Sequence, residues 1–234
     1  MAWLLAMTVG LGILAIPQPL FAYHLQYRNY EIWSDRPIDP AIRQVLDDAT
    51  RRLASSELFD PEAPFRLFFC NEDWRMRLYT GAAGGVADNW LTRNIYLREA
   101  DIAANRIIPP SGRLADAGHR PLSYFIAHEA AHIMQGRAFG PALKLTHPRW
   151  LIEGHADYVA KGGDFAFEEN RRLLRQADPR LDYARSGLYR RYHLMVALLL
   201  DKQGRPLQRL FAEPPSEAEI VRTLLGTDMR LPPL

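Results

Sequence analysis

The sequence predicts an α+β protein in which a small sheet precedes a set of helices. Short segments typical of strands occur only in the first half of the chain, whereas apolar residues at helical spacing dominate from Pro121 onward. The 234 residues, 48% apolar and 24% charged, have the composition of a folded globular protein. We therefore expect a single domain over residues 23–234, with a sheet lobe at residues 23–120 and a helical lobe at residues 121–234.

The sheet lobe is expected to hold strands and one helix. Residues 27–33 alternate apolar or aromatic with polar side chains, and residues 65–70 and 94–97 are short apolar runs, so each predicts a strand. Residues 40–58 have apolar positions at helical spacing. Residues 101–120 show no period and contain adjacent prolines, which predicts a loop.

The helical lobe is expected to begin with Pro121 in a first helical turn. Ser216 followed by Glu219 forms a capping-box pattern that predicts the start of the last helix. The expected helices cover residues 121–137, 147–161, 168–176, 188–203, 206–211 and 216–225.

The first 22 residues carry no charged side chain, and their apolar stretch ends at Pro17, which is short for a bilayer span. Ala22 supplies the small residue that signal peptidase needs. We expect residues 1–22 to be a cleaved signal peptide or an uncleaved N-terminal anchor, with a buried helix as the remaining alternative. In a bacterial envelope, the first two place the chain outside the cytoplasm, either periplasmic or secreted, with membrane contact only through a retained anchor.

Charge and cysteine content exclude several classes of protein. The net charge is +2 and the basic residues are spread along the chain, so no nucleic-acid partner is expected. The single cysteine, Cys70, excludes an internal disulfide and a zinc site built mainly on thiolates. Cys70 lies in an apolar run and is expected to be a buried side chain. The sequence gives no indication of oligomeric state.

The segment His128-Glu-Ala-Ala-His132 carries the clearest chemistry in the sequence. Two histidines four residues apart project from one face of a helix and can reach a single metal ion. Glu129 lies beside them, where it can contact a metal-activated water without binding the metal. The competing interpretation is a helix whose two histidines are satisfied by ordinary hydrogen bonds.

A catalytic zinc ion needs a third protein ligand and an open position for water. Glu153 lies on the next predicted helix, on a face that is otherwise apolar, where an unpartnered carboxylate would be costly. It is therefore the expected third ligand. Asp157, one helical turn later, is expected to orient a ligand histidine through its far ring nitrogen, the alternative being a solvated side chain near a helix end.

Together, His128-Glu-Ala-Ala-His132 and Trp150-Leu-Ile-Glu153-Gly-His-Ala-Asp157-Tyr158 resemble the gluzincin zinc peptidases, the group of thermolysin and aminopeptidase N. The resemblance covers about residues 95–204 and implies a zincin-like catalytic core at the junction of the two lobes. It implies Zn²⁺ bound by His128, His132 and Glu153, with Glu129 as general base and acid. Ala138 takes the place of the third histidine of the metzincin pattern, which excludes that related group.

The gluzincin pattern also implies a Tyr or His that stabilises the oxyanion of the tetrahedral intermediate. In the aminopeptidase-like branch this Tyr opens a helix that ends at a Gly several turns later, and Tyr189 stands in that relation to Gly204. Tyr192, His193 and Tyr183 are alternatives.

This sequence departs from the aminopeptidase pattern at the GxMEN motif, which residues 81–89 resemble only loosely. The resemblance therefore does not carry aminopeptidase specificity. Residues 81–89 and 94–97 are expected instead to form an edge strand that pairs with an extended substrate.

The predicted function is hydrolysis of a peptide bond by metal-activated water, with a peptide or protein as the substrate. A cell-wall peptide would use the same residues. The alternative is a non-catalytic zinc-binding envelope scaffold or binding protein of the same fold.

Overall fold

A computed structural model describes residues 15–79, 85–88, 92–108, 120–163, 165–186 and 188–226. The strands are β1 (Tyr23–Tyr27), β2 (Tyr30–Ser34), β3 (Phe65–Cys70), β4 (Gly85–Ala87), β5 (Asn94–Arg98), β6 (Ala100–Asp101) and β7 (Arg106–Ile107). The α-helices are α2 (Ile42–Leu53), α3 (Asp73–Tyr79), α4 (Leu122–Phe139), α5 (Leu143–Thr146), α6 (Arg149–Lys161), α7 (Phe167–Arg175), α8 (Tyr183–Ser186), α9 (Arg190–Ala197), α10 (Leu207–Ala212) and α11 (Glu217–Leu225). Short turns of other helix types are η1 (Gln18–Leu20), η2 (Pro179–Leu181) and η3 (Leu198–Lys202), which continues α9 as a π-helix.

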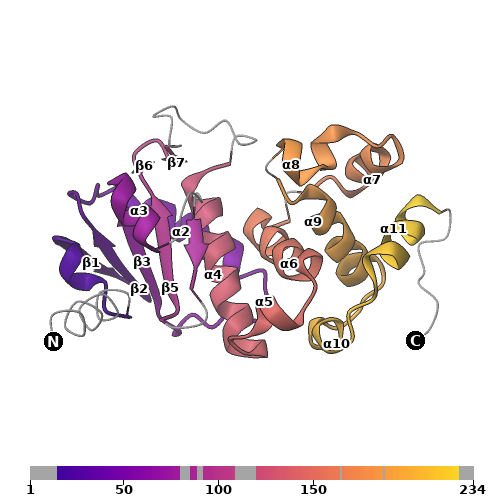
Figure 1. Cartoon of the computed structure of the whole chain (residues 1–234), viewed down its shortest axis with the longest axis horizontal. Coiled ribbons are helices and arrows are strands. Elements are labelled where there is room, and N and C mark those ends of the chain that lie inside the picture. The colour runs from indigo at the N-terminus through magenta and orange to yellow at the C-terminus, as the bar shows by residue number, and fades with distance from the viewer. Residues whose placement is uncertain are drawn as a thin grey trace, which may run out of the picture.

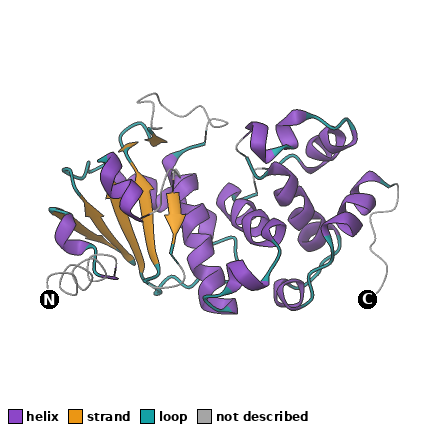
Figure 2. Ribbon diagram, in the orientation of Figure 1, coloured by secondary structure: helices purple, strands orange, loops and turns teal. Residues whose placement is uncertain are grey.

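The larger sheet has the strand order β1-β2-β3-β5-β4. Its centre is parallel, since β3 pairs in parallel with both β2 and β5, while β1 and β4 are antiparallel strands at the two edges. Figures 1 and 2 show this sheet at one end of the molecule and helices at the other, with α4 between them. The α+β class and the order of the two lobes are therefore confirmed.

Each face of the sheet buries a different set of side chains, because successive residues of a strand point to opposite sides. Leu67 and Phe69 of β3 belong to the main core, which also takes in α2 and α4. Phe68 and Cys70 point to the other face, where α3 and residues near η1 cover them. Cys70 is buried, as expected, and burial raises the pKa of its thiol to about 12.

A separate apolar cluster holds the helical half together. It joins α5, α6, α9, η3, α10 and α11 through residues such as Trp150, Leu194 and Phe211. Ser216 and Glu219 form the predicted capping box of α11. The predicted long apolar helix is also present, as α9 and η3, and it ends before Gly204, which has a φ of +64°.

The structure corrects the prediction at the start of the sheet. Residues 27–33 are not one strand, because Arg28, with a φ of 50°, turns the chain between β1 and β2, which pair as a hairpin. The sequence pattern also missed α3, whose exposed Trp74 and Leu78 obscure its apolar face. Within the predicted loop at residues 101–120, β6 and β7 form a short hairpin, and residues 109–119 lie outside the described part of the chain.

The predicted leader falls mainly on residues 1–14, which lie outside the described residues. No helix among the described residues is long and apolar enough to span a membrane. Phe21, directly before the predicted cleavage residue Ala22, is buried and packs edge-on against Phe68 with ring centroids 5.1 Å apart. Cleavage after Ala22 would therefore remove an aromatic side chain from the core beneath α3.

Candidate metal centre

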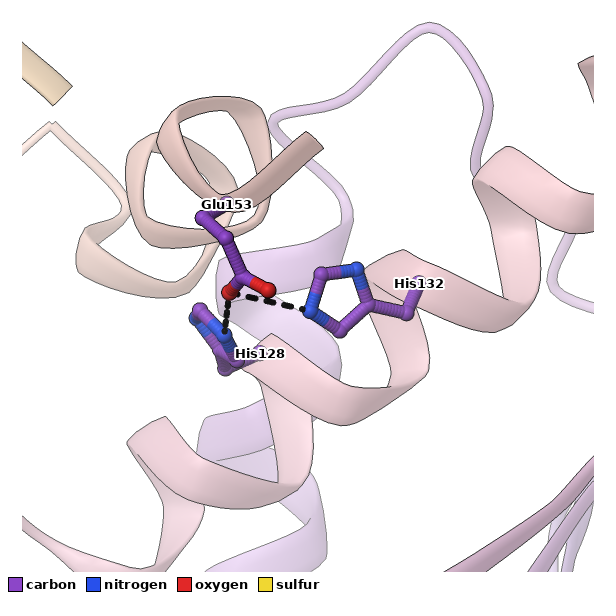
Figure 3. Close-up of side chains that lie close together, drawn as sticks. All are labelled: His128, His132 and Glu153. Atoms are coloured by element: carbon purple, nitrogen blue, oxygen red, sulfur yellow. Dashed lines mark ion pairs between the residues drawn. The ribbon is translucent and has the colours of Figure 1, made fainter. Parts of the chain in front are cut away.

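The side chains of His128, His132 and Glu153 converge between α4 and α6 (Figure 3). Both histidine Nε2 atoms face the same carboxylate oxygen, Oε2 of Glu153, at 3.3 Å from His128 and 3.5 Å from His132. Potential ligand atoms of all three residues lie within 4.8 Å of one another. The predicted ligand set is therefore brought together by the fold, and its residues could hold a metal ion.

The packing of α4, α6 and α9 sets this geometry. The first two helices run in opposite directions, since Tyr124 near the start of α4 contacts Asp157 late in α6, whereas Gln135 late in α4 contacts Ile152. Gly154, the residue after Glu153, lets α9 approach closely. A Cβ atom there would lie 2.6 Å from the backbone oxygen of Tyr192.

The donor set fits a small divalent ion that binds nitrogen and oxygen. Ligand atoms about 2.0–2.1 Å from a tetrahedral zinc ion lie about 3.3–3.4 Å from each other. The two separations between Nε2 and Oε2, 3.3 and 3.5 Å, match that spacing. Two imidazoles and one carboxylate also leave a fourth position for water, as in catalytic zinc sites.

Gln135 fixes the orientation of His132, a role that the sequence analysis missed. Its Nε2 donates to the carbonyl oxygen of Ile152 at 2.9 Å and contacts His155 Nδ1 at 3.0 Å, so its Oε1 is the atom that faces His132 Nδ1 at 3.0 Å. Because that oxygen can only accept, His132 Nδ1 must donate. In the neutral ring, the lone pair therefore lies on Nε2, which points to Glu153.

No comparable hydrogen bond orients His128 within the described part of the chain. Among the described residues, no group forms a hydrogen bond with its buried Nδ1 atom. Instead, the ring is held by stacking on Tyr189, with centroids 5.6 Å apart and planes 5° from parallel. One imidazole is thus held by an amide and the other by an aromatic ring.

Electrostatics favour a cation at this point. Burial raises the pKa of Glu153, but its contacts with the two histidines outweigh burial and hold that pKa well below its usual range. Burial alone would lower the pKa of His132, yet the hydrogen bond and charge of Glu153 raise it. By contrast, burial and the nearby His132 lower the pKa of His155 to about 3, so His155 is neutral.

Glu129 lies beside the candidate ligands, next to His128 in α4. Among the described residues, none donates a hydrogen bond to it or pairs with it. The side chain lies against β4, because a Cβ atom at Gly85 would be 3.1 Å from Glu129 Oε1. The edge of the sheet near the site is thus β4, whereas residues 94–97 belong to β5, an inner strand. Residues 81–84 and 89 of the GxMEN-like segment lie outside the described residues.

Of the residues expected to stabilise the oxyanion, Tyr189 has a ring contact with a candidate ligand, His128. It is the N-cap residue of α9 and stacks on His128. Arg149, one turn before Glu153, donates to its hydroxyl oxygen at 3.5 Å. Burial, followed by the charge of Glu153, raises the pKa of Tyr189, so the hydroxyl remains a donor. Tyr183 also stacks on Tyr189, with centroids 4.5 Å apart.

Asp157 does not orient a ligand histidine, contrary to the expectation. Its side chain points instead to α9 and the start of α4, and its Oδ2 accepts from His193 Nδ1 at 2.8 Å. Its Oδ1 accepts from the Tyr124 hydroxyl and pairs with Arg120 at 3.1 Å. These four residues form a second buried polar group, which we call the Asp157 cluster. His193 belongs to this cluster through its contact with Asp157, whereas Tyr189 stacks on the candidate ligand His128.

The Gln135 contact could have been suspected from its spacing, since it follows His132 by three residues on a predicted helix. Nothing in the local pattern indicated that Asp157 would meet His193, which lies 36 residues away. No family model, curated protein or solved structure matches this chain, so its site is interpreted from its own residues.

Proposed function

We propose that this protein is a zinc-dependent peptidase with a zincin-like core of the gluzincin type. The observation that carries the proposal is the convergence of two imidazole nitrogens and one carboxylate next to a second carboxylate, that of Glu129, which has no partner among the described residues. Metal-assisted hydrolysis of an amide requires one group of residues that binds the metal ion and a separate base that accepts a proton from water.

His128, His132 and Glu153 would hold the zinc ion, which would supply Lewis-acid activation of water and of a carbonyl group near neutral pH. Glu129 takes the proton from the attacking water at its carboxylate and passes it to the leaving amine. Its lack of a partner among the described residues leaves both oxygens available for this role. Tyr189 donates its hydroxyl hydrogen to the developing oxyanion, and Arg149 stabilises that hydroxyl from the other side.

The substrate in this proposal is a peptide or protein in extended form. β4 is short, lies at the edge of the sheet, and contacts Glu129 through Gly85. A peptide that pairs with the open side of β4 would place its backbone beside that carboxylate. A location outside the cytoplasm, based on residues 1–22, belongs to the same proposal.

The test is zinc content and turnover of the full chain and of a Glu129→Gln variant. We expect about one zinc per chain by plasma mass spectrometry in both proteins. Cleavage of a quenched peptide library should fall about 100-fold or more in the variant, since a general base contributes about 10²–10⁴. Glu62→Gln makes the same chemical change on an exposed side chain and should leave turnover unchanged.

The outcomes separate the alternatives. Zinc bound by a chain that cleaves no member of the library would favour a non-catalytic scaffold or binding protein of this fold. Absence of zinc from a folded preparation never exposed to chelator would reject the metal site itself.

A further inference from the structure

A cavity of about 460 Å³ lies in the helical half, among α7, η2, α8, α9 and α11. It falls within the size range of pockets that bind small organic groups, about 300–1,000 Å³. Most of its wall is apolar, and the aliphatic part comes from Leu174, Ala177, Leu181, Leu188, Val221 and Leu225. The zinc motifs contribute none of these residues.

Each charged residue on the wall forms an ion pair, although the buried Nε of Arg191 has no hydrogen-bond partner among the described residues. Asp178 pairs with Arg180 at 3.0 Å, and Asp182 with Arg185 at 3.5 Å. Arg191 pairs with Glu217 at 2.6 Å. A charged ligand group would have to compete with these pairs, whereas an apolar group would only displace water from an apolar wall.

Tyr189 links this cavity to the metal centre. It lines the cavity and also stacks on His128, and its other neighbour, Tyr183, lines the cavity as well. The three rings form one stack that runs from a metal ligand to the cavity wall. The cavity wall therefore comes within one aromatic ring of His128, where the proposed function places the scissile bond.

We propose that this cavity is a specificity pocket that binds a large apolar or aromatic side chain of the peptide substrate. The proposal rests on the proposed function for the identity of the ligand as a peptide. The volume favours a bulky side chain over a small one, because a small one would leave much of the apolar wall in contact with water.

Binding can be measured independently of turnover with N-acetyl-phenylalaninamide, N-acetyl-alaninamide and N-acetyl-lysinamide on the zinc-loaded full chain. We expect the phenylalanine compound to bind at least about tenfold more tightly than the other two, as apolar pockets discriminate by about 10–200-fold. Val221→Trp fills the cavity and should remove this preference. Arg222→Trp places the same side chain on an exposed position of α11 and should leave it intact.

Cleavage of a peptide library supplies the second measurement. One position near the scissile bond should favour Phe and Leu over Ala and Lys, and Val221→Trp should abolish that preference while cleavage of peptides with Ala there continues. Equal binding of the three amides would overturn the pocket assignment whether or not peptides are cleaved. Preferential binding without any cleavage would support the pocket and reject the peptidase. Binding seen only after deletion of residues 227–234, which follow α11, would assign the cavity to the chain's own C-terminus and also overturn the proposal.

Discussion

Two buried polar groups lie one helical turn apart between α4 and α6, and they satisfy their polar atoms in opposite ways. In the Asp157 cluster, both carboxylate oxygens accept from donors supplied by other elements, namely His193, Tyr124 and Arg120. In the candidate metal centre, the described residues offer the Glu153 carboxylate two Nε2 atoms, and that of His132 bears a lone pair when its ring is neutral. Both oxygens of Asp157 therefore have donors without a ligand, whereas Glu153 and its two histidines require a proton or a metal ion between them.

This difference shows how α4 and α6 can carry both a polar cluster that supports the fold and a candidate metal centre. Glu153 and Asp157 lie four residues apart on α6, with the Glu153 side chain 16% exposed and that of Asp157 fully buried, so spacing alone does not distinguish their roles. What distinguishes them is whether the facing residues offer hydrogens or lone pairs. Paired isosteric substitutions test that distinction directly.

The largest contrast is expected in zinc affinity. Glu153→Gln removes a ligand charge, so zinc affinity should fall by more than about 100-fold, beyond the 10–100-fold typical of residues that only orient ligands. Asp157→Asn should keep about one zinc per chain. Competition with a fluorescent zinc chelator measures both. Equal losses in the two variants would show that the two groups are not functionally distinct.

The free energy of unfolding should show the reverse order, with a larger loss in Asp157→Asn than in Glu153→Gln. Asp157→Asn breaks a buried charge group and should lower the free energy of unfolding by about 3–5 kcal/mol at pH 7. Burial raises the pKa of Asp157, but His193 and Arg120 outweigh it and hold that pKa well below its usual value. A depressed carboxyl pKa stabilises the fold above the unfolded pKa of about 3.9, and this stabilisation is lost as the pH falls towards the folded value.

The difference between wild type and Asp157→Asn should therefore narrow below about pH 4. Urea unfolding followed by circular dichroism, with chelator present to remove any metal contribution, provides the measurement. If the difference in the free energy of unfolding stays constant from pH 7 to pH 3, Asp157 is not stabilised as a carboxylate by the other members of the Asp157 cluster.

Removal of the hydroxyl group should affect kcat differently at Tyr189, beside the candidate metal centre, and at Tyr124, in the Asp157 cluster. Tyr189→Phe removes the proposed oxyanion donor and should lower kcat by about 10²–10³. It should leave zinc content unchanged. Tyr124→Phe takes a donor from Asp157 and should cost about 1–3 kcal/mol of stability while sparing kcat. Should Tyr124→Phe produce the larger loss of kcat, the oxyanion role would pass to the Asp157 cluster.

The sequence predicted those parts of the molecule that depend on local periodicity. The helices that carry His128, His132 and Glu153 were expected, and β3 matches residues 65–70. The contacts that define the Asp157 cluster were not predictable, because they depend on how closely α9 packs on α6 at Gly154. The hairpin of β1 and β2 was missed because Arg28 adopts a positive φ without the glycine that usually signals such a turn.

The smallest expected effect concerns the residue that orients His132. Gln135→Leu removes the acceptor for His132 Nδ1 and the donor to Ile152, so zinc affinity should fall about 10–100-fold without loss of the site at saturating zinc. Gln135→Glu keeps an acceptor for Nδ1 and should retain more affinity than the leucine variant. Gln176→Leu, on an exposed position, serves as the control. Equal affinities for the Leu and Glu variants would show that Gln135 only supports the packing of α4 on α6, because the orienting effect depends on an oxygen that accepts from the ring.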